Sequence, residues 1–256
     1  MGRASHRAFT LIELLVVLAI IALLMAILIP ALQRIKEGSR DVVCRSNLRS
    51  IGLGITAYLQ DNDFKAANNN ATNGFFWRVA AGGVRGTNDR DAYWGVAYVR
   101  QLPQEDVFGC PSYRRVAELI YANDPKLIYH AAYGLTSYLF RSPGSNGMTT
   151  ALTVRSTARI SHQDQFIVTH DHVEPKLEQD SVDMFCNSGP GTSNLTMYRQ
   201  GGQRTKFYRG IFRHAIRLQG EFTTGGHANI LWLDDHVSSL NETTGDNVPK
   251  KWYQGY

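Results

Sequence analysis

The sequence has little of what marks an enzyme or a nucleic-acid-binding protein. Only three of its 256 residues are cysteine, and none of them forms the Cys-x-x-Cys pair of a zinc or redox site. A His-Glu-x-x-His zinc motif, a Gly-x-Ser-x-Gly nucleophile motif and a phosphate-binding P-loop are all missing. The net charge is only +5, and the arginines are scattered, with no basic run interleaved with aromatic residues. The sequence therefore predicts neither catalysis nor nucleic-acid binding.

One long apolar run dominates the N-terminal part of the chain. From Leu11 to Ile29 there are nineteen positions, and all except Glu13 are Leu, Ile, Val, Ala or Met. A run of this length can cross a bilayer as one helix. A carboxylate inside such a helix costs a few kcal/mol on insertion, so Glu13 requires a partner, and a positive charge is the expected one.

Two simpler interpretations of this run are an ordinary membrane anchor and a secretory signal peptide. A signal peptide has a shorter apolar core that is followed by a small-x-small cleavage site. Residues 30–34, Pro-Ala-Leu-Gln-Arg, fit such a site poorly.

Residues 7–13, Arg-Ala-Phe-Thr-Leu-Ile-Glu, resemble the processing site of type IV pilins and of the pseudopilins of type II secretion systems. In that family a prepilin peptidase cuts before the Phe and methylates the new amino terminus. The resemblance implies a cut between Ala8, where the family usually has glycine, and Phe9. It also implies that Glu13 pairs with the terminal amine of a neighbouring subunit and so sets the axial register during assembly. Pro30 lies where many type IV pilins carry a helix-loosening proline.

The charges around the apolar run predict its orientation in the inner membrane. Arg3, His6 and Arg7 precede the run, so the positive-inside rule places the N-terminus in the cytoplasm and the rest of the chain in the periplasm. Arg34 and Lys36 follow the run, and the family resemblance therefore decides this orientation. The resemblance also allows the processed chain to end up in an extracellular filament.

Apolar residues continue at helical spacing beyond the run. They recur at intervals of four, three, four and three, on one helical face: Cys44, Leu48, Ile51, Ile55 and Tyr58. We predict a nearly continuous helix from about Thr10 to about Leu59, which is about 75 Å long at 1.5 Å per residue. Gly38, Gly52 and Gly54 are predicted soft points in it.

The three cysteines allow one intramolecular disulfide, and three pairings of Cys44, Cys110 and Cys186 are open. A periplasmic compartment is oxidising, which favours such a bond. The amphipathic face has to be covered by the rest of the chain, so it directs Cys44 toward the head and favours its pairing with Cys110. The alternative is that Cys44 is a small buried thiol.

The chain is predicted to consist of a leader (1–8), an N-terminal helix (9–60) with a transmembrane span at about 11–29, and an exported globular head (61–256). Within the head, the local patterns predict a helix exit at Asp61–Gly74, a strand or buried aromatic stretch at Tyr93–Val99, a short helix at Arg114–Tyr121, a strand at Gln165–Thr169, and loops at 142–147 and 187–202. The predicted fold class is α+β. A long helix, half transmembrane and half amphipathic, packs on a head with an antiparallel sheet.

The strongest β signal lies near the C-terminus. Residues 228–233 and 236–240 read as two strands around a two-residue turn, Asp234-Asp235. This end resembles large prepilin-like proteins that end in a His, a glycine-rich approach, a strand, Asp-Gly and a His-Val strand. Here Asp235 replaces the glycine of a turn that needs positive φ, and an insertion separates His214 from the glycines.

A metal site is one interpretation of the histidines in the last third. In a strand, alternate residues face one side and could bind one ion, with carboxylates of the terminal hairpin completing the set: His170, His172, Asp234, Asp235 and His236. Type II major pseudopilins bind calcium in a C-terminal loop, and Asp234, Asp235 or residues 241–246 could serve that role here. The alternative is that the histidines are ordinary polar or core residues. Assembly itself requires no cofactor.

The predicted function is structural and not enzymatic. The chain would be a pilin-like or pseudopilin-like subunit that prepilin peptidase processes and that assembles with copies of itself or related pilins. The competing hypothesis is a membrane-anchored binding module whose histidine-rich C-terminal region recognises a metal, a glycan or a secreted cargo. The two differ in whether the leader is removed.

Overall fold

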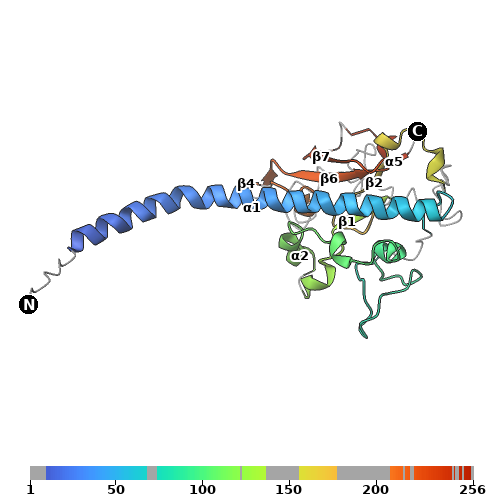
Figure 1. The fold of residues 1–256 in the computed structure, drawn as a ribbon, viewed down its shortest axis with the longest axis horizontal. Coiled ribbons are helices and arrows are strands. Elements are labelled where there is room, and N and C mark those ends of the chain that lie inside the picture. Colours follow the sequence, from blue (N-terminus) through green and yellow to red (C-terminus); the bar gives the residue numbers. More distant parts are fainter. Residues whose placement is uncertain are drawn as a thin grey trace, which may run out of the picture.

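The fold is a long helix with a head packed against one half of it. The computed structural model describes residues 10–67, 74–121, 123–136, 156–177, 208–215, 217–219, 222–243, 245, 248–249 and 251–254. Helix α1 spans Leu11–Asp61 as one 51-residue element, within two residues of the predicted ends. Its N-terminal half extends away from the head, whereas its C-terminal half crosses the head (Figure 1).

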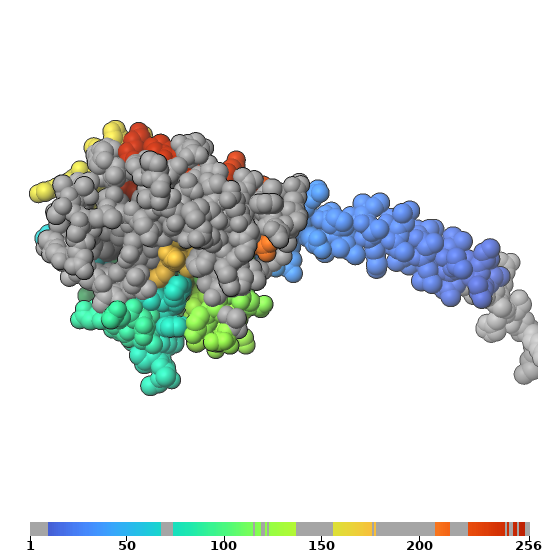
Figure 2. All heavy atoms as spheres, turned by 180° about the vertical axis from the view of Figure 1, so that it is seen from behind, coloured from blue at the N-terminus to red at the C-terminus, as the bar shows by residue number. Residues whose placement is uncertain are grey.

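The N-terminal half of α1 is exposed along its length. Every residue from Thr10 to Lys36 is exposed, and the large apolar side chains of Leu11–Ile29 are 43 to 81 % exposed. By length and composition this segment is able to span a membrane. Pro30 lies inside the helix, which continues through it although one backbone donor is lost. Figure 2 shows this half as a rod projecting from the head.

The C-terminal half of α1 buries the predicted face. Cys44, Leu48, Ile51 and Ile55 are at most 3 % exposed, and Leu59 replaces the half-buried Tyr58 at the end of the stripe. Gly52 and Gly54 were predicted as soft points, but both are buried contact sites. A Cβ on Gly54 would lie 2.2 Å from Leu102 Cγ, and one on Gly52 would lie 2.9 Å from Leu231 Cδ1. The two glycines therefore let the head approach the helix backbone.

The head is built on a five-stranded sheet, which confirms the α+β class. Its order is β3-β1-β2-β6-β7, and four strands are antiparallel to their neighbours while β3 runs parallel to β1. The strands are β1 (Tyr133–Thr136), β2 (Ile167–Asp171), β3 (Lys176–Leu177), β6 (His227–Trp232) and β7 (Val237–Asn241). A separate hairpin pairs β4 (Arg217–Gln219) with β5 (Phe222–Thr224). Helix α1 contacts β6 and β7, so the sheet covers its apolar face (Figure 1).

The C-terminal hairpin is confirmed, but its turn is one residue longer than predicted. Trp232 N–H donates to His236 O at 3.0 Å, so three residues, Leu233, Asp234 and Asp235, form the loop. A two-residue loop of type I′ needs positive φ at both central residues, which two aspartates tolerate poorly. In the longer loop Asp235 is the residue with positive φ, at +66°.

Tyr93–Val99 was predicted as a strand or a buried aromatic stretch, and it is a buried 3₁₀ helix, η1 (Trp94–Tyr98), so the second alternative is confirmed. Tyr93 OH and Trp94 Nε1 both donate to Tyr133 O, and satisfying these polar atoms favours the tight turn. The predicted short helix is confirmed as α2 (Arg114–Ile120). The other described elements are η2 (Glu105–Phe108), η3 (Pro125–Ile128), η5 (Thr157–Arg159), η6 (Gln163–Gln165) and α5 (Lys251–Gln254). The predicted loops at 142–147 and 187–202, and Cys186, lie outside the described residues.

Candidate functional site

The exposed half of α1 begins with a capping box. Thr10 N–H and Thr10 Oγ1 donate to Glu13 Oε2 at 2.9 and 2.8 Å, and Glu13 N–H donates to Thr10 Oγ1 at 3.3 Å. In the isolated subunit, the carboxylate of Glu13 therefore accepts the hydrogen bonds of Thr10 at the start of its own helix. This role was not predicted from the sequence, although Thr-x-x-Glu before an apolar run is its signature. The predicted processing residues Ala8 and Phe9 lie outside the described residues.

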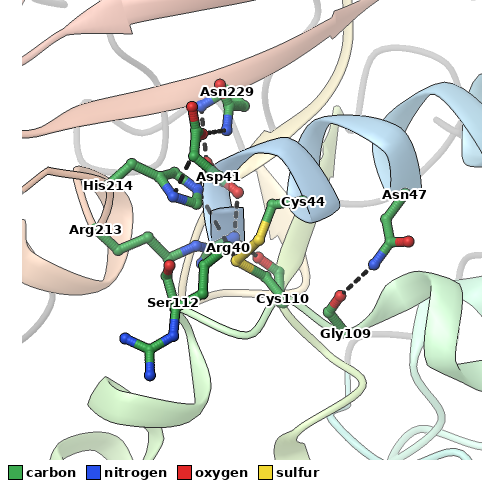
Figure 3. The surroundings of a disulfide bond; sticks show 12 residues. Arg40, Asp41, Cys44, Asn47, Gly109, Cys110, Ser112, Arg213, His214 and Asn229 are labelled. Atoms are coloured by element: carbon green, nitrogen blue, oxygen red, sulfur yellow. Dashed lines mark hydrogen bonds and ion pairs between the residues drawn. A yellow bond between two sulfur atoms is a disulfide. The ribbon is translucent and has the colours of Figure 1, made fainter. Parts of the chain in front are cut away.

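A disulfide joins the helix to the head. Cys44 of α1 and Cys110, which precedes α2, are bonded with their Cα atoms 5.1 Å apart, and both side chains are buried. This is the pairing that the amphipathic face favours. Nearby, Asn47 Nδ2 donates to Gly109 O at 2.7 Å (Figure 3). The middle of α1 is thus held covalently and by hydrogen bonds.

Beside the disulfide lies a group of polar residues from α1, β2, β6 and the segment before β4. We call it the anchor cluster: Asp41, Asp171, Arg213, His214, His227 and Asn229. Its centre is the fully buried carboxylate of Asp171, whose Oδ1 is paired with Arg213 Nη2. Asp171 Oδ2 accepts from Asn229 N–H at 2.7 Å and lies 3.0 Å from His214 Nε2. Burial alone would raise the pKa of Asp171, but Arg213, His214 and the Asn229 amide outweigh burial and lower it.

The guanidinium of Arg213 is satisfied by backbone oxygens as well as by Asp171. Its Nη2 donates to Ala132 O at 2.5 Å and its Nη1 donates to Gly210 O at 2.9 Å. The guanidinium also lies over the rings of Tyr113 and Tyr133, at 5.1 and 5.6 Å from the ring centroids. This buried cation therefore ties β1, α2 and the segment before β4 together.

Asp41 brings helix α1 into the anchor cluster. Its Oδ1 accepts from Asn229 Nδ2 at 2.7 Å and lies 3.3 Å from His227 Nε2 and 3.4 Å from His214 Nδ1. Burial raises the pKa of Asp41, but the hydrogen bonds from His227 and Asn229 and the charges on both histidines outweigh it and lower the pKa to about 2. The rings of His214 and His227 stack with centroids 5.3 Å apart. His214 therefore bridges two carboxylates, one on the helix and one in the sheet.

The histidines and carboxylates of the predicted metal set do not come together. His170 and His172 lie side by side, with ring centroids 5.4 Å apart, at the end of β2. The antiparallel register pairs Trp232 with Ile167, so the hairpin turn lies beyond the opposite end of β2. His170 Nε2 is 3.1 Å from Tyr253 OH, and burial lowers the pKa of His170 to about 4.

The turn residues of the predicted metal set have other partners. His236 Nδ1 lies 2.5 Å from Asp234 Oδ1, and the His236 ring stacks on Trp232. Both carboxylate oxygens of Asp235 accept from Thr56 Oγ1, at 3.0 and 2.9 Å, which fixes the turn to α1. Burial raises the pKa of Asp235. The turn thus serves as a second attachment of the head to the helix.

The disulfide is expected to contribute a large part of the stability of the head. It closes a loop with a sequence separation of 66 residues, for which the chain-entropy model gives about 4 kcal/mol. In a Cys186→Ser background, replacing both Cys44 and Cys110 by serine should lower the free energy of unfolding by about this amount. Denaturant unfolding in detergent, followed by tryptophan fluorescence, measures the difference against Cys186→Ser alone. A loss below about 1 kcal/mol would contradict the expectation.

Comparisons with known proteins bear on the N-terminal segment. Residues 3–29 match the prokaryotic N-terminal methylation motif. The N-terminal segment is of the prepilin type. A ComG operon protein 3 homolog from Bacillus licheniformis is 34 % identical over 64 residues, which cover 25 % of this chain and 66 % of that protein. The match thus spans just under two thirds of the relative's length. No solved structure matches the chain. The pilin-like character therefore rests on the matched motif and on this partial likeness to one relative.

Proposed function

We propose that the chain is a structural subunit of a type IV pilus or of a type II secretion pseudopilus. Prepilin peptidase would cut between Ala8 and Phe9 and methylate Phe9, and the processed subunits would assemble through α1. The observation that carries this proposal is the methylation motif at residues 3–29, continuous with a 51-residue helix whose first half lies outside the head.

The geometry of α1 supports assembly through this helix. Before assembly the exposed apolar half would lie in the inner membrane as a single span, with the N-terminus in the cytoplasm and the head in the periplasm. In a filament the same side chains would pack against α1 of neighbouring subunits. The disulfide and the anchor cluster hold the head to the middle of α1, so the head would follow any movement of the helix.

The mass of the N-terminal peptide of the purified chain tests this proposal. We expect a chain that begins at Phe9 and carries one methyl group on its terminal amine. The control is the same chain from cells without prepilin peptidase, which should keep residues 1–8. An intact leader in normal cells would contradict the proposal and would favour the anchored binding module.

A further inference from the structure

We propose that the dithiol form of the chain binds one zinc ion through Cys44, Cys110 and His214. The two sulfur atoms and the nearest ring nitrogen of His214 lie within 4.8 Å of one another. Cys110 Sγ is 3.9 Å from His214 Nε2, and Asp171 Oδ2 is 3.0 Å from the same nitrogen. In a tetrahedral zinc site sulfur ligands lie at about 2.3 Å and nitrogen or oxygen ligands at about 2.0 Å from the ion. Once the disulfide is reduced and its sulfur atoms separate, these three side chains would reach one ion and leave its fourth position open.

The surroundings of these ligands match what zinc sites require around the metal. A zinc-bound histidine usually presents its second ring nitrogen to a carboxylate, which fixes the tautomer. Here His214 Nδ1 lies 3.4 Å from Asp41 Oδ1, so a proton on Nδ1 would leave Nε2 to face the sulfurs. The carboxylate of Asp171, which is paired with Arg213, lies beside Nε2 of the same histidine. All three ligand side chains are buried.

Zinc binding and the disulfide exclude each other, because both use the sulfur atoms of Cys44 and Cys110. Zinc binding to the dithiol releases two protons from the thiols and transfers no electrons. Oxidation by a protein disulfide, which takes up two electrons and becomes a dithiol, would then form the Cys44–Cys110 bond and release the ion. Zinc would thus hold α1 to the head before the disulfide forms.

A groove lies next to the proposed site, on the side of Asp41. It has a volume of about 780 Å³ and lies where α1 leaves the head, and Asp41 and His227 are among the residues that line it. Asp41 also contacts His214, so an ion in the groove would be one side chain away from the ligands.

Metal titration of the full-length Cys186→Ser chain in detergent tests the proposal. After reduction with a phosphine, we expect about one zinc per chain to remain after desalting, and none on the oxidised chain. Cobalt is the spectroscopic probe, since two thiolate ligands give a sulfur-to-cobalt charge-transfer band. A reduced chain that retains no zinc, or a cobalt complex without this band, would overturn the proposal.

His214 and His227 form a matched pair for this test, because they stack on each other and both contact Asp41. We expect His214→Ala to weaken zinc binding by at least about 100-fold, whereas His227→Ala should change it by less than about threefold. Formation of the Cys44–Cys110 disulfide in oxidised His214→Ala shows that this variant folds. If this variant does not fold, the cobalt spectrum of the Cys186→Ser chain alone tests the proposal. Equal effects of the two substitutions would contradict the assignment.

Discussion

Glu13→Ala is expected to abolish assembly while leaving the chain inserted in the membrane. The side chain lies in the exposed half of α1, and in a filament its charge would face the methylated amine of the next subunit. Removing the carboxylate lowers the cost of inserting the helix by a few kcal/mol, so the membrane fraction should not lose protein. Electron microscopy of sheared filaments, with immunoblots of membrane fractions, measures both outcomes.

The capping box makes a second variant necessary, because alanine removes a helix cap as well as a charge. Loss of a cap costs about 1 kcal/mol. Glu13→Gln keeps a side-chain oxygen that can accept from Thr10 but carries no charge. If charge pairing between subunits drives register, the glutamine variant should fail like the alanine variant. Normal filaments from Glu13→Gln would show that the cap matters and that the ion pair does not.

Arg213→Met is expected to destabilise the head by about 3–5 kcal/mol, because it removes the guanidinium that is paired with the buried carboxylate of Asp171. Methionine retains much of the volume between Tyr113 and Tyr133, so the loss reports on charge more than on packing. Denaturant unfolding of the full chain in detergent, followed by tryptophan fluorescence, gives the free energy. A loss below about 1 kcal/mol would contradict the role that we assign to this pair.

Two further variants separate the buried pair from a general effect of removing arginine. Arg78 pairs with Glu105 at the surface, where its side chain is 56 % exposed, so Arg78→Met should cost less than about 1 kcal/mol. Adding Asp171→Leu to Arg213→Met removes the orphaned charge and should recover part of the loss. Recovery should remain incomplete by about 1–3 kcal/mol, because the Asn229 amide then has no acceptor.

The local features of this protein were readable from its sequence. The apolar run and the helical spacing beyond it predicted α1 within two residues at each end, and strand patterns around Asp234-Asp235 predicted the C-terminal hairpin. The same helical face pointed to Cys44 and Cys110 as neighbours, and the structure joins them. Each of these inferences depends on periodicity or turn preference over a few consecutive residues.

Predictions failed where side chains from distant segments decide the conformation. For the stretch at Tyr93, a strand was one of two alternatives, and it forms η1 instead because two of its polar atoms reach Tyr133 O. Gly52 and Gly54 were predicted as soft points of the helix, but side chains of the head pack directly against their backbone. The predicted metal set combined histidines at one end of β2 with turn residues that lie beyond its other end, because the pairing of β2 with β6 could not be predicted from the sequence.

The sequence by itself determined the prepilin-type start, the apolar rod and the existence of a separate head, because each depends on the order of neighbouring residues. Only the tertiary structure decided the anchor cluster. Asp41 and Asn229 are 188 residues apart, and no periodic pattern relates them. Their pairing follows from burial, because a charged or polar group that folding removes from water must find a partner among the groups buried beside it.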